Sequence, residues 1–313
     1  MKKILVTGAF GQIGSELTPT LQNKYGVENV IATAHKNIPG DFKGTIEKVE
    51  INDLSKLESI IKKHDIGEVY HLVSLLSVGG EAQPDLCWEI NMGGLKNVLD
   101  LAREYKLKVF WPSSIAAFGP TTPKDNTPQR TILEPTTMYG VTKVAGELLC
   151  QYCFLKYGVD VRSVRYPGII GWKTPPSSGT SEYSIAMFYE GLQKGSYTCF
   201  LREDTMIPMM YINDAVKSTI MIMDTPAEKI KIRTSYNIAA LSFSAKELEE
   251  EIKKHISLTV NYQPDERQKI ADSWPNSLDD SEARADWGWK HEYDLSQLVE
   301  EIIKNLKVKL AIK

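Results

Sequence analysis

The most informative pair of residues for chemistry is a tyrosine followed four positions later by a lysine. Tyr139 and Lys143 stand at the start of a helical pattern, 138–157, so their spacing predicts that both side chains lie on one face, one turn apart. A free tyrosine has a pKa of about 10 and is a poor base at neutral pH, whereas a neighbouring ammonium favours the phenolate. The pair therefore predicts a base that removes the proton from a substrate hydroxyl.

A pair of serines, Ser113 and Ser114, follows the apolar run 109–112, which predicts that the pair lies at the carboxyl end of a buried strand. From that position the Ser114 hydroxyl can hydrogen-bond a substrate hydroxyl and hold it against Tyr139. A Tyr-x-x-x-Lys pattern alone is common on surface helices, but its combination with the serine pair and a glycine-rich first turn is not. We therefore predict a catalytic trio of Ser114, Tyr139 and Lys143.

The glycine-rich turn follows the first strand-like run, 4–7, and opens the helical pattern 13–24. Glycines in such a turn permit a tight bend and let the backbone approach a pyrophosphate, while the helix N-terminus offers free N–H groups and the positive end of its dipole. This placement predicts a dinucleotide site whose contacts come from Gly8, Gly11, Gln12, Ile13 and Gly14.

The residues after the second predicted strand, 30–33, bear on the choice between NAD and NADP. The dinucleotide fingerprint places an acidic residue about 20 positions after the glycines, where it binds the ribose hydroxyls of NAD. Here Ala34 occupies that place, and His35 and Lys36 follow it. The two basic residues either contact the adenosine end of the cofactor or are solvated loop residues. NAD is the expected cofactor, and NADP stays open because of Ala34.

The first half of the chain alternates short β-branched runs with amphipathic helical patterns, which predicts an α/β fold with a doubly wound parallel sheet of the Rossmann type. The predicted strands are 4–7, 30–33, 47–51, 69–73, 109–112 and 161–165, and the predicted helices are 13–24, 55–64, 85–105 and 138–157. A turn-rich stretch follows Tyr166, and beyond it we predict strands at 209–212 and 259–262 and helices from Asp214, at 244–255 and at 295–306.

The turn-rich stretch after Tyr166 predicts that the chain is divided into two parts of unequal size. We assign residues 1–165 and about 209–239 to a dinucleotide-binding domain. Residues 166–208 and 240–313 are assigned to a smaller, discontinuous α+β lobe that binds the substrate. In a sheet of this kind ligands bind outside the carboxyl ends of the strands, so we expect the lobe to cover that edge.

The composition favours a soluble enzyme that acts on a small molecule. The 313 residues carry 37 Lys and Arg against 40 Asp and Glu, a balance that gives no electrostatic case for binding nucleic acid or an anionic membrane. Four cysteines, among them the pair Cys150 and Cys153, fit free thiols of a reducing compartment better than disulfides, so we expect a cytoplasmic protein. The histidines show no metal-ligand spacing, and we expect no metal.

Taken together, the motifs of the first half resemble those of the extended short-chain dehydrogenases: Gly8 to Gly14, Asp53-Leu54, His71-Leu72, Asn91, Ser113-Ser114 and Tyr139-x-x-x-Lys143. Within that family, three later segments are similar to the short-chain L-threonine 3-dehydrogenases: Arg165–Pro176, Pro208–Asp214 and Ala271–Pro275. The resemblance implies oxidation of the threonine β-hydroxyl to 2-amino-3-oxobutyrate, with hydride transfer to NAD.

The resemblance also implies roles for further residues. Asp53 and Leu54 would contact the adenine, and the cofactor would also be contacted by Leu72, Tyr166 and Pro167. The amino-acid pocket would be lined by Ser77, Ser114, Tyr139, Thr180 and Trp274. Such enzymes pair through their two long helices, here 85–105 and 138–157, which implies a homodimer.

The sequence departs from this subgroup at a few positions near the expected site. Ala34 replaces the usual acid, Val78-Gly79-Gly80 replaces small Ala and Thr residues, and Glu182 stands where Asp is usual. Cofactor choice and strictness for threonine therefore stay open, with a nucleotide-sugar epimerase or dehydratase and a carbonyl reductase as alternatives on the same scaffold. We also expect the stretch 172–183 to close over the substrate, since a hydride-transfer site excludes water.

Overall fold

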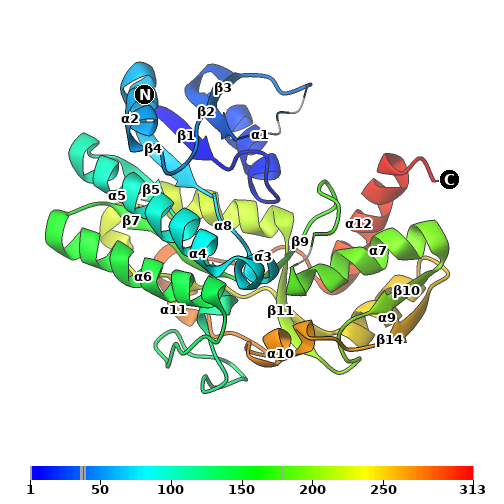
Figure 1. Ribbon diagram of the computed structural model, residues 1–313. Helices are drawn as coiled ribbons and strands as arrows, with labels where there is room; N and C mark the ends of the chain where they lie inside the picture. Colours follow the sequence, from blue (N-terminus) through cyan, green and yellow to red (C-terminus); the bar gives the residue numbers. More distant parts are fainter. Residues whose placement is uncertain (1, 36–37, 39, 178, 313) are drawn as a thin grey trace.

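The computed structural model describes residues 2–35, 38, 40–177 and 179–312. Its centre is a six-stranded parallel sheet in the order β3-β2-β1-β4-β5-β7 (Figure 1). These strands are β1 (Lys3–Thr7), β2 (Val30–Ala34), β3 (Thr45–Lys48), β4 (Ile66–His71), β5 (Lys108–Phe110) and β7 (Val161–Arg162). The strand order reverses between β1 and β4, which opens a crevice at the carboxyl ends of the strands. The prediction of a doubly wound α/β fold is confirmed.

Helices cover both faces of this sheet because successive strand residues point to opposite sides. Ile4 and Val6 of β1 lie in one buried cluster, and Leu5 lies in the other. The first face is covered by α1 (Gly14–Tyr25) and α8 (Ile212–Asp224), and the second by α2 (Leu54–His64), α5 (Gly94–Tyr105) and α6 (Met138–Tyr157) (Figure 1). The bounds predicted for α6 agree with the structure, those of α2 differ by one residue at the start, and those of α1 differ by one residue at both ends.

The single helix predicted over 85–105 is wrong in one respect, because it is interrupted. The segment consists of α4 (Pro84–Trp88), a π-helical turn η2 (Glu89–Gly93) and then α5. The π turn contains Asn91, whose side chain accepts from the Leu75 N–H (2.8 Å) and donates to the Thr142 hydroxyl (3.1 Å). These bonds to two other segments give a reason for the irregular turn, and such turns often mark functional sites.

Two strands predicted as continuous are also divided. The run 109–112 ends as β5 at Phe110 and resumes as β6 (Ser113–Ser114), and the run 161–165 splits into β7 and β8 (Val164–Tyr166). Pro112 has no N–H for a ladder bond, which ends the pairing there. The second pieces form a separate parallel sheet, β12-β8-β6, with β12 (Tyr236–Asn237). This shift carries Ser113 and Ser114 past the end of the main sheet.

The second lobe contains two small sheets and several helices, and it lies beside the main sheet in Figure 1. Its strands are β9 (Gly168–Ile170), β11 (Met206–Tyr211) and β13 (Leu241–Ser244) in one sheet, and β10 (Ser196–Cys199) and β14 (Thr259–Tyr262) in the other. Its helices are α7 (Tyr183–Lys194), α9 (Ala245–Lys253), α10 (Arg267–Asp272) and α12 (Leu295–Lys309), whereas α11 (Ser281–Trp287) lies on the other side of the molecule, below α6 in Figure 1, and contacts β12. Strands predicted at 209–212 and 259–262 are present, whereas α7 was not predicted.

Several short elements complete the chain. These are the helix α3 (Ser77–Ala82) after β4, and the 3-10 turns η1 (Val27–Asn29), η3 (Ile115–Ala117), η4 (Thr180–Glu182) and η5 (Ala227–Lys229). The residue ranges that we assigned to a dinucleotide-binding domain and a substrate lobe stay a prediction. Along the described ranges of the chain, no helix is both long and apolar enough to cross a membrane.

A buried ion pair fastens α6 to the sheet β12-β8-β6. Both Glu147 oxygens accept from Arg165, the Nε bond being 2.8 Å and the Nη2 bond 2.7 Å long. The hydroxyl of Ser113 donates to the same carboxylate at 2.6 Å. Glu147 is 1% exposed and Arg165 3%. Bidentate pairing and the added hydroxyl bond satisfy charges that would otherwise be costly to bury.

We expect Glu147→Ala to lower the free energy of unfolding by about 3–5 kcal/mol, because it leaves the Arg165 guanidinium buried without its carboxylate. Urea-induced unfolding measures this change. Asp100→Ala removes an exposed i,i+4 pair with Lys96 on α5 and should cost less than about 1 kcal/mol. Equal costs for the two variants would contradict the central role of the buried pair.

Candidate active site

A cavity of about 130 Å³ lies at the carboxyl ends of β1, β4 and β6, between the main sheet and the second lobe. Eleven of the residues proposed from the sequence line it: Gln12, Ile13, Leu72, Ser77, Ser114, Tyr139, Lys143, Tyr166, Pro167, Thr180 and Trp274. The other proposed residues that the structure describes lie outside its wall: Gly8, Gly11, Gly14, His35, Asp53 and Leu54. Lys36 lies outside the described residues.

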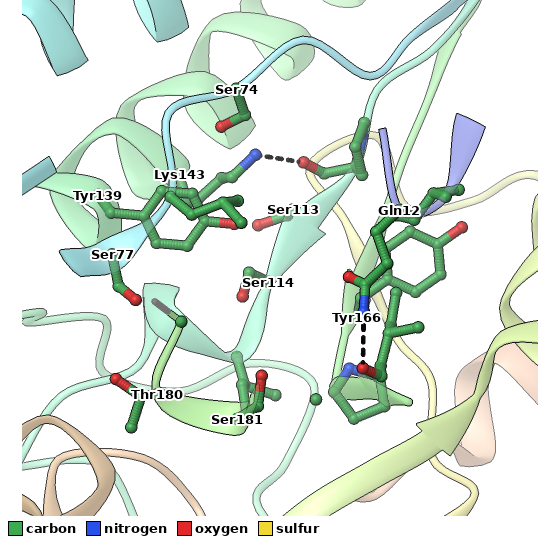
Figure 2. Close-up of a pocket in the computed structure, with 18 of the residues that line it drawn as sticks. Gln12, Ser74, Ser77, Ser113, Ser114, Tyr139, Lys143, Tyr166, Thr180 and Ser181 are labelled. Carbon is green, nitrogen blue, oxygen red and sulfur yellow. Dashed lines mark hydrogen bonds between the residues drawn. The ribbon is translucent and has the colours of Figure 1, made fainter. Parts of the chain in front are cut away.

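Tyr139 and Lys143 lie together at the start of α6, as their spacing predicted. The Lys143 Nζ is 5.2 Å from the centre of the Tyr139 ring and 4.7 Å from the centre of the Trp111 ring. It donates a 2.7 Å hydrogen bond to the carbonyl of Pro112, the residue at which the strand is broken (Figure 2). A proline carbonyl outside the ladder is free to accept this bond, so the break between β5 and β6 helps to place the lysine.

Burial moves the ionisation of these two groups in opposite directions. It raises the pKa of Tyr139 to about 12, although the hydrogen bond with Ser114 lowers it in part, and it lowers the pKa of Lys143 to about 7. The sequence led us to expect that Lys143 and the positive nicotinamide ring of an oxidised cofactor together lower the tyrosine pKa. In the protein without cofactor, burial penalises both charged forms and leaves the amine only partly charged at neutral pH. The combined effect of lysine and cofactor stays a prediction.

Three hydroxyl groups line the cavity beside Tyr139. Ser77 at the start of α3, Ser114 in β6 and Thr180 in η4 come from three separate segments, and Figure 2 shows them around one space. Thr180 is 1% exposed, and its Oγ1 has no hydrogen-bond partner among the residues the structure describes. A buried hydroxyl without a partner costs about 1–3 kcal/mol. A polar ligand in the cavity would relieve that cost.

The opposite wall joins the glycine-rich turn to the second lobe. The Gln12 amide donates to the Ile169 carbonyl at 3.1 Å and to the Glu182 carboxylate at 3.4 Å (Figure 2 shows the first bond). Glu182 also accepts from the Ser177 N–H at 2.9 Å, and burial raises its pKa. The sequence marked Glu182 as a position where similar enzymes have Asp. In the structure its carboxylate joins the Gln12 side chain of the turn to the Ser177 N–H of the stretch 172–183.

The backbone of the glycine-rich turn fits the pyrophosphate of a dinucleotide. Gly8 has a φ of +72°, which other residues rarely adopt. A Cβ on Gly14 would lie 2.2 Å from the Gly8 carbonyl oxygen, so only glycine permits this close turn at the start of α1. The N-terminus of α1 then faces the same edge of the sheet as the cavity, where its free N–H groups suit phosphate oxygens.

At the expected adenosine end of the site, β2 ends without an acidic residue, but Glu50 lies close by, just after the neighbouring strand β3. Ala34 ends β2, and its carbonyl accepts from Val49 just after β3. Glu50 follows, and its carboxylate lies 2.7 Å from the His35 Nε2. A carboxylate here suits ribose hydroxyls and repels a 2′-phosphate, which favours NAD. The sequence analysis missed Glu50 because it considered only the residues after the second strand.

Several other cavity residues were not proposed as site residues: Ser74, Leu76, Pro112, Ser113, Ser181 and Glu182. The sequence could have indicated these residues only by their positions, which are one to three residues away from proposed site residues. Asp53 instead caps α2, accepting from the Lys56 N–H at 2.9 Å. In the described part of the chain, no group of three or more His, Cys, Asp or Glu side chains could hold a metal ion.

Solved structures of L-threonine dehydrogenases are similar to this chain over nearly its whole length. The GalE-like L-threonine dehydrogenase of Cupriavidus necator in its holo form is 48% identical, with a TM-score of 0.96, over 97% of this chain and 100% of that one. The apo form of that enzyme has a TM-score of 0.85. The L-threonine dehydrogenase of Clostridium difficile is 46% identical at a TM-score of 0.96, over 99% of this chain and 98% of that one.

Family-level comparisons agree with this. An uncharacterized epimerase/dehydratase of Staphylococcus haemolyticus is 43% identical over 99% of both chains. A nucleoside-diphosphate-sugar epimerase of Agrobacterium tumefaciens, at 21% identity and a TM-score of 0.86, shares the fold. The model of the NAD dependent epimerase/dehydratase family matches residues 4–239, which include the glycine-rich turn, both catalytic candidates of α6 and the strands that place them. The chain belongs to the NAD-dependent epimerase/dehydratase family.

Proposed function

We propose that this protein oxidises the β-hydroxyl of L-threonine to 2-amino-3-oxobutyrate with NAD as the hydride acceptor. The observation that carries the proposal is the small cavity in which Tyr139, Ser114 and Lys143 meet a wall of further hydroxyl groups. Its volume of about 130 Å³ is below the roughly 300–1,000 Å³ usual for larger ligands. The similarity to L-threonine dehydrogenases supports the same substrate.

The proton is the part of the reaction that this chain's own residues handle. Ser114 holds the substrate hydroxyl beside the Tyr139 oxygen, and Tyr139 accepts its proton as general base. Lys143, fixed by Pro112, supplies positive charge next to the phenol. NAD, when bound, would supply the acceptor for the hydride of the carbon that bears the hydroxyl. Tyr166 ends β8, where it pairs with Ser114 of β6. Together with Pro167 it lines the cavity on the side that we assign to the cofactor.

The amino acid's own charged groups would meet the hydroxyls of Ser77 and Thr180. Trp274 is 6% exposed and closes this end of the cavity, and its carbonyl accepts from Lys124 at 2.8 Å. Thr180 and Trp274 both come from the segments that we assign to the substrate lobe, 166–208 and 240–313. We keep the proposal that 172–183 acts as a lid, because it carries Thr180 between anchors at its two ends.

Purified protein should reduce NAD in the presence of L-threonine, and it should do so faster than with NADP because of Glu50. Tyr139→Phe should lower kcat by at least about 10²-fold, since it removes the general base. NADH absorbance measures both. Cofactor binding without turnover of L-threonine would contradict the proposal and point to another hydroxy or keto substrate.

The pH dependence should follow the ionisation of Tyr139. The base is the phenolate, and its pKa in the free protein is raised to about 12, so oxidation should accelerate as pH rises above neutrality. The Ser114 hydrogen bond lowers that pKa, so Ser114→Ala should move the ascending limb of kcat/KM to higher pH as well as lower its height. A limb that stays in place would show that another group titrates.

Thr180→Val tests whether the Thr180 hydroxyl is reserved for substrate. The variant removes a buried polar atom without a partner in the described structure, so the free energy of unfolding should stay constant or rise by about 1 kcal/mol, while KM for L-threonine rises about tenfold. Thr219→Val is the matched control, since that buried hydroxyl contacts Tyr166 and the Ala215 carbonyl. The control should lower stability and leave KM unchanged.

We also propose a homodimer that pairs through the segment 85–105, which comprises α4, η2 and α5, and through α6. Within them, α4 and α6 expose large apolar side chains, an arrangement that usually marks an interface: Leu86, Trp88, Val141, Leu148, Tyr152 and Leu155. One similar enzyme is described as monomeric, so the pairing needs a direct test. The four buried free cysteines of the described chain support a reducing location, and we propose the cytoplasm.

Leu155→Glu should convert the dimer to a monomer, because Leu155 is 73% exposed in the single chain and a charge there would be desolvated on pairing. Light scattering after size-exclusion chromatography measures the mass. Val308→Glu is the control, since that residue is 81% exposed on α12, far along the chain from this face. A wild-type mass equal to one chain would refute the dimer.

A further inference from the structure

One face of the short helix α3 makes a series of contacts with the start of α6. Ser77, Gly80 and Glu81 are spaced i, i+3 and i+4, which places them on one side of the helix. Ser77 lines the cavity, and a Cβ on Gly80 would lie 3.6 Å from the Tyr139 Cβ. The Glu81 Oε1 accepts a 2.6 Å hydrogen bond from the Met138 N–H.

The Glu81 bond occupies a favourable place at the N-terminus of α6. The first N–H groups of a helix have no partner within it, and their partial positive charge favours a carboxylate. Thr137 accepts from the Gly140 N–H at 3.1 Å, while Glu81 accepts from Met138, the residue before Tyr139. Met138 and Gly140, the residues on either side of Tyr139, therefore each donate to a capping side chain. Of the two caps, only Glu81 comes from another helix.

A cleft of about 420 Å³ lies between α3 and α10, with Val78 and Glu81 on the α3 side and Arg267 and Lys269 on the α10 side. In Figure 1, α3 lies between the sheet domain and the second lobe, beside α6. Helix α3 also contacts α4, where a Cβ on Gly80 would meet Cys87. The position of α3 therefore depends on its packing against α4 and α6 and on the Glu81 bond.

We propose that Glu81 is a positioning residue for substrate binding, which locks α3 onto α6 and so sets the distance between the Ser77 hydroxyl and Tyr139. Gly80 permits the two helices to approach, since any side chain there would press on Cys87 at 3.0 Å and then on Tyr139. The Glu81 carboxylate then fixes the position of α3 along α6. This role in recognition rests on the proposed oxidation of L-threonine, in which Ser77 binds the amino acid.

The test compares Glu81→Ala with Glu81→Gln, whose amide oxygen can still accept from Met138. Steady-state kinetics with L-threonine and NAD are measured together with hydrogen exchange at 77–82. For Glu81→Ala we expect about a tenfold higher KM for L-threonine, the size of one lost hydrogen bond to a charged group, with kcat and the KM for NAD nearly constant. Exchange at 77–82 should rise, and Glu81→Gln should restore both readouts. Gln83→Ala, an exposed side chain at the end of α3, should match the wild type.

Two results would overturn the proposal. Unchanged exchange at 77–82 in Glu81→Ala would show that the bond does not hold α3. Raised exchange with an unchanged KM for L-threonine would show that the bond is structural only. If the wild type binds NAD but does not oxidise L-threonine, the proposed function fails, and the exchange data still decide whether Glu81 locks the two helices.

Discussion

The buried carboxylate of Glu147 receives hydrogen bonds from Ser113 and Arg165, and through them it holds three elements at fixed distances. It lies on α6, one turn after Lys143 and two turns after Tyr139. Ser113 directly precedes Ser114, whose hydroxyl lies beside Tyr139. Arg165 directly precedes Tyr166, which lines the cavity on the side that we assign to the cofactor. The catalytic helix, the serine strand and the strand β8 are therefore fastened at a single point. Displacing any one of the three elements would leave a buried charge without its partner, which is costly.

The dry environment that this clamp maintains also determines the resting charge of the site. Burial leaves Tyr139 protonated and Lys143 only partly charged at neutral pH, so little phenolate is available in the free protein to accept a proton. A cation brought close to the phenol would lower its pKa more effectively in this surrounding than in water, since charges interact strongly where the dielectric is low. The amount of phenolate thus depends on occupancy of the site. Ser114 supplies the part of the stabilisation that is present without a ligand.

The sequence predicted the elements whose pattern is local. Helix α6 has an apolar face and a capping Thr137, and its bounds agree with the prediction. Helix α7 was missed because it directly follows the turn-rich stretch after Tyr166, and its charged and amide side chains lie only near its C-terminal end. Features set by contacts between distant segments were also missed. The π turn at Asn91 depends on Leu75, and the place of Glu50 beside His35 depends on the adjacency of β2 and β3. The direction of the Tyr139 pKa shift required knowledge of burial.

The choice of substrate depends more on polar groups than on shape. An apolar pocket separates ligands by about 1–3 kcal/mol per methylene, whereas buried hydrogen-bonding groups reject a ligand that leaves them without partners far more strongly. Here Ser77, Ser114 and Thr180 form such a set around a small cavity. A hydroxy compound without the amino or carboxylate group would still reach Tyr139, but it would leave at least one of these hydroxyls buried without a bond. The Thr180 hydroxyl, which has no partner in the described structure, would gain one from a small substrate that carries polar groups at both ends.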